Sequence, residues 1–148
     1  MTIVGLQEAD RSGAAGIAGL RVPAAVGALA LGITAVAAWH DPYLSGAYLG
    51  CPFYLLTGMY CPICGSTRAL YDLAHLDLSA AWGMNPLFVL VVPLLVVTWL
   101  RWSVRSWRGG VGTGFRPLSP RRALVGLVVL LVFGIARNIP VLAPWLAP

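Results

Sequence analysis

Three long apolar runs constrain the fold of this chain more than any other feature of its sequence. They cover Val22–Trp39, Leu87–Leu100 and Ala123–Ala136. Hydrophobic residues make up 59% of the chain and charged residues only 10%, whereas a soluble domain carries about 25% charged residues. Because so few polar side chains are available to cover a globule in water, much of the surface must face lipid. The sequence therefore predicts an all-α integral membrane protein with three transmembrane helices.

Proline and helix-capping residues set the expected ends of these helices. Pro23 suits a first helical turn, and Asn85-Pro86 and Ser119-Pro120 each pair a good N-cap residue with a good first residue. A helix rises about 1.5 Å per residue, so runs extended to these caps approach the roughly 30 Å of bilayer hydrocarbon. The expected transmembrane helices are residues 22–40, 85–107 and 120–138.

The arginines predict how these helices are oriented in the membrane. All basic residues are Arg, a bias typical of a GC-rich bacterial genome. Most of them lie in the N-terminal tail or around the loop between the second and third transmembrane helices, and only Arg68 and Arg137 lie elsewhere. The positive-inside rule then predicts a cytoplasmic tail, residues 1–21, and a cytoplasmic Arg/Gly-rich loop, residues 108–119. The Pro-rich C-terminal tail, residues 139–148, is expected outside, and its three prolines predict that it forms no regular helix. We expect a multi-pass protein of the bacterial inner (plasma) membrane.

The segment between the first two transmembrane helices, residues 41–84, is expected on the extracytoplasmic face and contains all three cysteines of the chain. The sequence Cys61-Pro62-Ile63-Cys64-Gly65 is a tight CPxCG turn. Pro62 fixes φ, and Gly65 permits a left-handed backbone or a close backbone approach. Such a turn presents two sulfurs on one side, and a structural disulfide, a metal site and thiol redox chemistry all fit it.

Each of these three uses has its own candidate residues. In an oxidising exterior, Cys51 could pair with Cys61 or Cys64 and close a loop of about ten residues, worth roughly 2–3 kcal/mol. A zinc site could use Cys51, Cys61, Cys64 and His75 as a Cys3His set, although strong zinc signals have two paired ligand turns. A C-x-x-C pair that opens a helix lowers a thiol pKa, but nothing here suggests the βαβ scaffold of such oxidoreductases. No cofactor is expected, with zinc as the alternative.

The residues after the turn predict a short interfacial helical hairpin. Residues 66–76 form an amphipathic pattern in which Arg68, Asp72 and His75 share one face. This face is either solvated, with a weak ion pair of about 0.3–0.5 kcal/mol, or a polar cluster that fixes the hairpin or meets a partner. Asp77 should cap a second short helix, residues 78–82, that ends at Gly83.

The run CPFYLLTGMYCPICGSTRALYDLAHLDLSAAWGMNPL resembles the bacterial membrane family catalogued as domain of unknown function 2752. The shared pattern is a CP pair, then C-P-x-C-G-x-T-R, an amphipathic stretch with an Asp, and an Asn-Pro that opens a membrane helix. The matching positions are Cys51, Pro52, Cys61, Pro62, Cys64, Gly65, Thr67, Arg68, Asp77, Asn85 and Pro86. The resemblance covers residues 50–100 and implies a helical membrane protein with a functional or structural cysteine turn, without an activity.

These features favour a binding or structural role over catalysis. No charged residue is expected at mid-depth in a transmembrane helix, where ion pathways need one, and no haem-binding His pair is present there. Small residues in the first transmembrane helix offer a packing surface: Ala24, Ala25, Gly27, Ala28, Ala30 and Gly32.

We therefore expect a non-catalytic accessory or structural subunit of a larger bacterial inner-membrane complex, with a respiratory complex as one candidate host. Its expected partners are the lipid bilayer and other integral membrane subunits. No nucleic acid is expected, since no basic-aromatic stripe is present. The alternative function is a membrane-anchored thiol-redox or zinc-binding protein that uses the CPxC turn.

Overall fold

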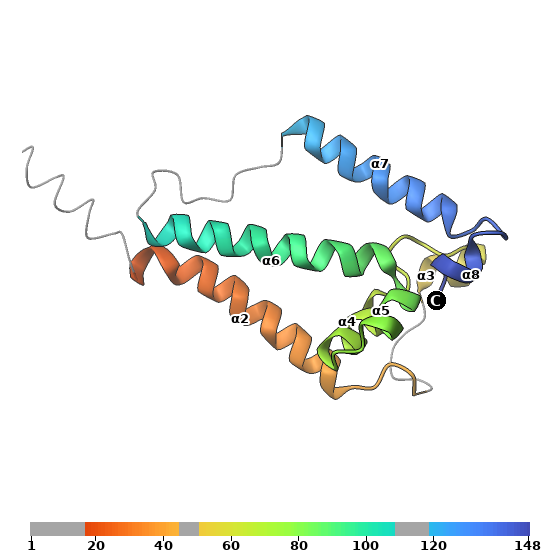
Figure 1. Cartoon of the computed structure of the whole chain (residues 1–148), viewed down its shortest axis with the longest axis horizontal. Helices are drawn as coiled ribbons and strands as arrows, with labels where there is room; N and C mark the ends of the chain where they lie inside the picture. The colour runs from red at the N-terminus through yellow and green to blue at the C-terminus, as the bar shows by residue number, and fades with distance from the viewer. Residues whose placement is uncertain (1–16, 45–50, 109–118) are drawn as a thin grey trace, which may run out of the picture. The chain divides into compact units, whose positions relative to one another are not determined.

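The secondary structure of the chain is helical throughout the residues that the computed structural model describes, which are 17–44, 51–108 and 119–148 (Figure 1). The all-α prediction is confirmed for these residues. Most of the predicted N-terminal tail and of the Arg/Gly-rich loop lies outside them. The helices are α2 (Ile17–Trp39), α3 (Pro52–Thr57), α4 (Ser66–Ala74), α5 (Leu78–Met84), α6 (Pro86–Trp107), α7 (Pro120–Ala136) and α8 (Ala143–Leu146).

Two helices are long and apolar enough to cross a membrane. They are residues Gly19–Trp39 of α2 and Pro86–Trp107 of α6, which correspond to the first two predicted transmembrane helices. α7 has 17 residues and ends at Ala136, before the expected end at residue 138, so its length alone does not mark it as a third one. Large apolar side chains on all of these helices are exposed, among them Leu31, Leu94 and Val132.

Pro23 does not lie in the first turn of its helix, as the sequence predicted. α2 already runs from Ile17, so Pro23 lies inside the helix and removes one of its internal hydrogen bonds. Arg21 interrupts the apolar run and so hid the earlier helical turns, but its side chain is exposed and fits within a helix. The start that the sequence predicted for this helix was therefore wrong.

The chain divides into two compact units. The described part of the first unit contains α2 up to Gly32 and α6 from Pro93 onward. The indole N–H of Trp99 donates a hydrogen bond to the Pro23 carbonyl at 2.9 Å. A Cβ atom added to Gly27 would lie 2.6 Å from Cζ2 of the same indole. α2 and α6 therefore pack closely here because Gly27 leaves room for the Trp99 ring.

The second unit contains the hairpin of α4 and α5. Ala69 of α4, Ala81 of α5 and Val89 of α6 form its small buried core. Both alanines are fully buried, which lets the two short helices approach closely. The Asp77 carboxylate accepts a hydrogen bond from the Ala80 N–H at 2.9 Å, which confirms the predicted N-cap of α5.

The boundary between α5 and α6 lies at Asn85. Asn85 has an extended backbone, and its side-chain oxygen accepts a hydrogen bond from the Phe88 N–H at 3.0 Å, as an N-cap of α6 should. α5 continues to Met84 and does not end at Gly83, as the sequence predicted. The extended backbone of Asn85 ends the helix, and Gly83 lies within its last turn.

The C-terminal tail is more regular than its prolines suggest. The sequence predicted no regular helix there, but α8 forms a single turn. Pro144 lies in the first turn of α8, where its missing N–H removes no helical hydrogen bond.

Replacing Gly27 by a large residue should separate α2 from α6. Gly27→Leu should lower the free energy of unfolding in detergent by about 1–3 kcal/mol, because the added side chain overlaps the Trp99 ring. Gly32→Leu is the matched control, since no atom lies within 4 Å of its added Cβ. Equal unfolding midpoints for the two variants would contradict this packing.

Candidate functional site

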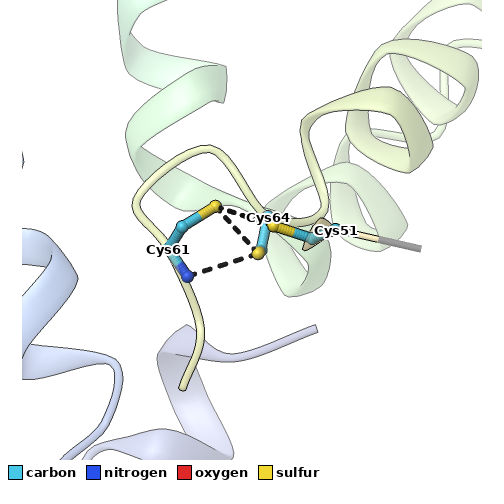
Figure 2. Close-up of side chains that lie close together, drawn as sticks. All are labelled: Cys51, Cys61 and Cys64. Atoms are coloured by element: carbon cyan, nitrogen blue, oxygen red, sulfur yellow. Dashed lines mark hydrogen bonds between the residues drawn. The ribbon is translucent and has the colours of Figure 1, made fainter. Parts of the chain in front are cut away.

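The three cysteines gather into one cluster (Figure 2). Cys61 Sγ lies 2.9 Å from Cys64 Sγ and 3.5 Å from Cys51 Sγ, and all three sulfurs lie within 4.8 Å of one another. All three are free thiols, at separations longer than the roughly 2.05 Å of a disulfide bond. Cys64 is buried, whereas Cys51 and Cys61 are partly exposed. The structure therefore brings together the cysteines that the sequence singled out.

The CPxCG turn is held by its own backbone and by a glycine. The Cys64 N–H donates to the Cys61 carbonyl at 3.1 Å, and the Cys61 N–H donates to Cys64 Sγ at 3.2 Å. Gly65 has a left-handed backbone, with φ +81°, and forms the N-cap of α4. A Cβ atom added to Gly65 would lie 2.5 Å from the Met84 carbonyl oxygen. The two roles predicted for Gly65, a left-handed backbone and a close backbone approach, are thus confirmed. A larger residue would be strained at this φ and would overlap the Met84 carbonyl.

The third sulfur comes from the start of α3, a helix that the sequence did not predict. Cys51 is its N-cap residue and Pro52 its first residue. A hydrogen bond from the Tyr54 backbone N–H, assisted by the Cys64 thiol, lowers the pKa of Cys51 to about 7. Burial raises the pKa of Cys64 to about 12, and its hydrogen bond with Cys61 acts in the same direction. The cluster thus combines one thiol that ionises near neutral pH with one that resists ionisation.

A buried arginine holds the turn from the far end of the sequence. Arg137 follows α7 and is 0% exposed. Its Nη1 donates to the carbonyl oxygens of Cys61 at 3.0 Å, Cys64 at 2.9 Å and Pro62 at 3.4 Å. Its Nη2 donates to the Met84 carbonyl at 3.3 Å. The sequence counted Arg137 only toward membrane orientation, although an arginine on the expected outer side runs against the positive-inside rule and was a usable signal.

Two asparagines complete the attachment of the turn. The Asn138 side chain accepts from the Tyr60 N–H and donates to the Tyr60 carbonyl, both at 2.8 Å. The Asn85 amide donates to the carbonyls of Pro62 and Cys64 and to the Ser66 hydroxyl, each at 3.1 Å. Asn85 therefore caps α6 and binds the cysteine turn at the same time. The sequence predicted only the first of these two roles.

His75 does not join the cysteine cluster, so the predicted Cys3His set is wrong. Its Nδ1 lies 2.9 Å from the Tyr71 carbonyl oxygen, one helical turn earlier. The centres of the His75 and Tyr71 rings lie 4.2 Å apart, with the rings tilted by 38°. The side chain is exposed. Within the described ranges, the group of side chains arranged as metal ligands contains Cys51, Cys61 and Cys64 alone.

The predicted polar face of α4 is partly buried and not simply solvated. Asp72 is 4% exposed and accepts a hydrogen bond from the Tyr43 hydroxyl at 2.8 Å. The Arg68 guanidinium carbon lies 5.5 Å from the centre of the Tyr43 ring. Burial and the Asp72 hydrogen bond raise the pKa of Tyr43 to about 12. This cluster fixes the hairpin to the residues that follow α2. Thr67, another residue of the cysteine motif, is exposed in the first turn of α4.

Comparison with known families extends over the cysteines, the hairpin and the first part of α6. Residues 51–99 match the family model described as "Protein of unknown function (DUF2752)". This match confirms the resemblance that the cysteine motif indicated. Arg137 and Asn138, which bind the turn, lie beyond the matched residues. No curated protein and no solved structure matches the chain.

The three clustered thiols should differ in reactivity. In reduced, metal-free protein, iodoacetamide should modify Cys51 fastest, because its thiolate population rises with pH through about 7. Cys64 should react slowest, since it is buried and its pKa is about 12. Peptide mass spectrometry across a pH series measures both rates. Denatured protein is the control, in which the rates should converge; equal rates in the folded protein would contradict the assignment.

Proposed function

We propose that this chain is a membrane-anchored metal-binding protein in which the thiolates of Cys51, Cys61 and Cys64 bind one zinc ion. The observation that carries this proposal is that all three sulfurs lie within 4.8 Å of one another. Sulfurs that share a tetrahedral zinc ion lie about 3.8 Å apart, since each Zn–S bond is about 2.3 Å long. A disulfide would join two of the thiols and leave the third unused, whereas a metal ion uses all three.

Three protein ligands leave one coordination position for a water molecule or for a ligand from another molecule. Zinc sites with three protein ligands differ in this respect from closed structural sites, which have four. Among the described His, Cys, Asp and Glu side chains, no other joins the three cysteines, and His75 lies against the Tyr71 carbonyl instead. The proposed site therefore suits the binding or exchange of a ligand or metal ion, and we assign no catalysed reaction to it.

We also propose that α7 crosses the membrane as a third transmembrane helix. α6 rises about 33 Å over its length, so its two ends would lie on opposite sides of a bilayer. The cysteine segment comes just before α6, yet Arg137, after α7, bonds to carbonyls of that segment. The chain must therefore return across the bilayer after Trp107, and α7, about 25 Å long, is the helix available.

The arginine distribution then supports the expected orientation. Six arginines lie between residues 101 and 122, from the end of α6 to the start of α7. The positive-inside rule favours the cytoplasm for this region. The cysteine cluster and the C-terminus would then lie on the extracytoplasmic face of a bacterial inner membrane.

Metal analysis of protein purified in mild detergent under reducing conditions tests the zinc site. Wild type should contain one zinc ion per chain, and Cys61→Ser should lose it, because Cys61 lies closest to both other sulfurs. His75→Ala is the control and should retain zinc. Wild type that takes up no zinc would overturn the proposal, and a disulfide among these cysteines in such protein would favour the thiol-redox alternative.

One observation favours a second role, as a non-catalytic accessory subunit of a larger membrane complex. Leu76 has a left-handed backbone, with φ +62°, and its side chain is 92% exposed. This backbone costs about 1–2 kcal/mol for a residue with a side chain and little for glycine. An exposed leucine at such a position contributes almost nothing to packing within its own chain. We propose that it contacts a partner subunit.

Purification in mild detergent after crosslinking tests this contact. Every preparation of the wild type should contain one and the same set of other membrane subunits at fixed stoichiometry. A respiratory complex is one candidate host. Leu76→Gly should weaken the association while the isolated chain becomes no less stable, because glycine relieves the backbone strain. Recovery of wild type only as a free monomer would contradict the accessory role.

A further inference from the structure

Arg137 is a buried cation beside the cysteine cluster, and no side-chain carboxylate among the described residues pairs with it. Its Nε is buried without a hydrogen-bond partner among the described residues. The side-chain carboxylates in the described ranges are hydrogen-bonded elsewhere: Asp41 accepts from the Tyr43 N–H, Asp72 from the Tyr43 hydroxyl, and Asp77 from the Ala80 N–H. Because a buried charge is costly unless it is compensated, the position of Arg137 points to an anion nearby.

The cysteine cluster can supply that anion when it binds a metal. Three thiolates with one Zn²⁺ ion carry a net charge of −1, which the single positive charge of Arg137 balances. The guanidinium is already bonded to the carbonyls of Cys61 and Cys64, two of the three proposed ligand residues. Thiolates at the same two residues would favour the charged form of the guanidinium.

We infer that Arg137 is the counter-charge and positioning residue of the zinc site, and that zinc binding is coupled to the docking of the C-terminal end of α7. This inference rests on the proposed zinc site. Residues that hydrogen-bond to metal ligands and orient them contribute strongly to metal affinity. Arg137 is in this position, because it bonds to the carbonyls of Cys61 and Cys64. The neighbouring Asn138 bonds both backbone groups of Tyr60, so the end of α7 and the turn are joined at two consecutive residues.

Coupling follows from thermodynamic linkage. Zinc favours the turn conformation in which the three sulfurs converge, and Arg137 and Asn138 bind the backbone of that same segment. Whatever stabilises the bound turn therefore stabilises the docked end of α7, and the reverse holds equally. Zinc should accordingly slow hydrogen exchange of the Tyr60 amide, which donates to Asn138.

Chelator competition on the full chain in detergent tests this inference, with Zn²⁺ as the ligand and Cd²⁺ as a spectroscopic probe of thiolate binding. Arg137→Gln should weaken zinc binding by about 10–100-fold, the range found for residues that support metal ligands. Arg137→Lys retains the charge but lacks the planar fork, so its affinity should fall between wild type and Arg137→Gln. Arg121→Gln is the control, since Arg121 lies exposed at the start of the same helix.

The outcomes separate this inference from the zinc site itself. Wild type that binds neither ion would overturn the zinc site and this inference together. Wild-type affinity in both Arg137 variants would overturn the role of Arg137 alone. If Arg137→Gln fails to fold, Arg137→Lys decides: weaker zinc binding, with zinc-dependent protection of the Tyr60 amide reduced, supports the inference, and unchanged values overturn it.

Discussion

The buried guanidinium of Arg137 binds four backbone carbonyl oxygens that come from two separate segments of the chain. Three belong to the CPxCG turn and one to Met84 at the end of α5, while Arg137 itself follows α7. Buried carbonyls require hydrogen-bond donors, and an arginine presents several in one plane. The conformation of the turn, and with it the convergence of three sulfurs, therefore depends on a residue more than seventy positions away in the sequence.

A membrane around the long helices would explain why so polar an arrangement lies in so apolar a chain. Among the described residues, the buried hydrophobic side chains are only Ala37, Cys64, Ala69, Ala81 and Val89. This is a much smaller buried core than soluble domains of this length usually have. Lipid would cover the long exposed faces of α2, α6 and α7, and the hairpin and turn would then be held mainly by specific polar contacts at the membrane surface.

Local rules predicted the parts of this structure that local chemistry determines. Asp77 caps α5, Asn85 and Pro86 open α6, and Gly65 has the left-handed backbone that its place in the turn suggested. Each of these depends on the conformation of a few consecutive residues, which spacing in the sequence can reveal. The gathering of the three cysteines was also foreseen as a possibility, although their pairing was left open.

Contacts between distant residues were the ones that spacing could not reveal. Arg137 looked like an orientation charge, and Asp72 looked more like a solvated residue than a fixed one, because their partners come from other segments. His75 had the right chemistry for a metal ligand, but the local geometry of α4 directs its ring onto Tyr71. Short helices such as α3 have too few residues for a periodic pattern. The sequence therefore did not predict that Cys51 lies at the start of a helix.

X-ray absorption spectroscopy at the zinc edge of the zinc-loaded protein tests most directly whether the three cysteines form one metal site. The account predicts three sulfur ligands at about 2.3 Å and one lighter ligand in the open position. A coordination shell of nitrogen and oxygen atoms alone would contradict it. A shell with fewer than three sulfurs would contradict it too, because Cys51, Cys61 and Cys64 would then not share the ion.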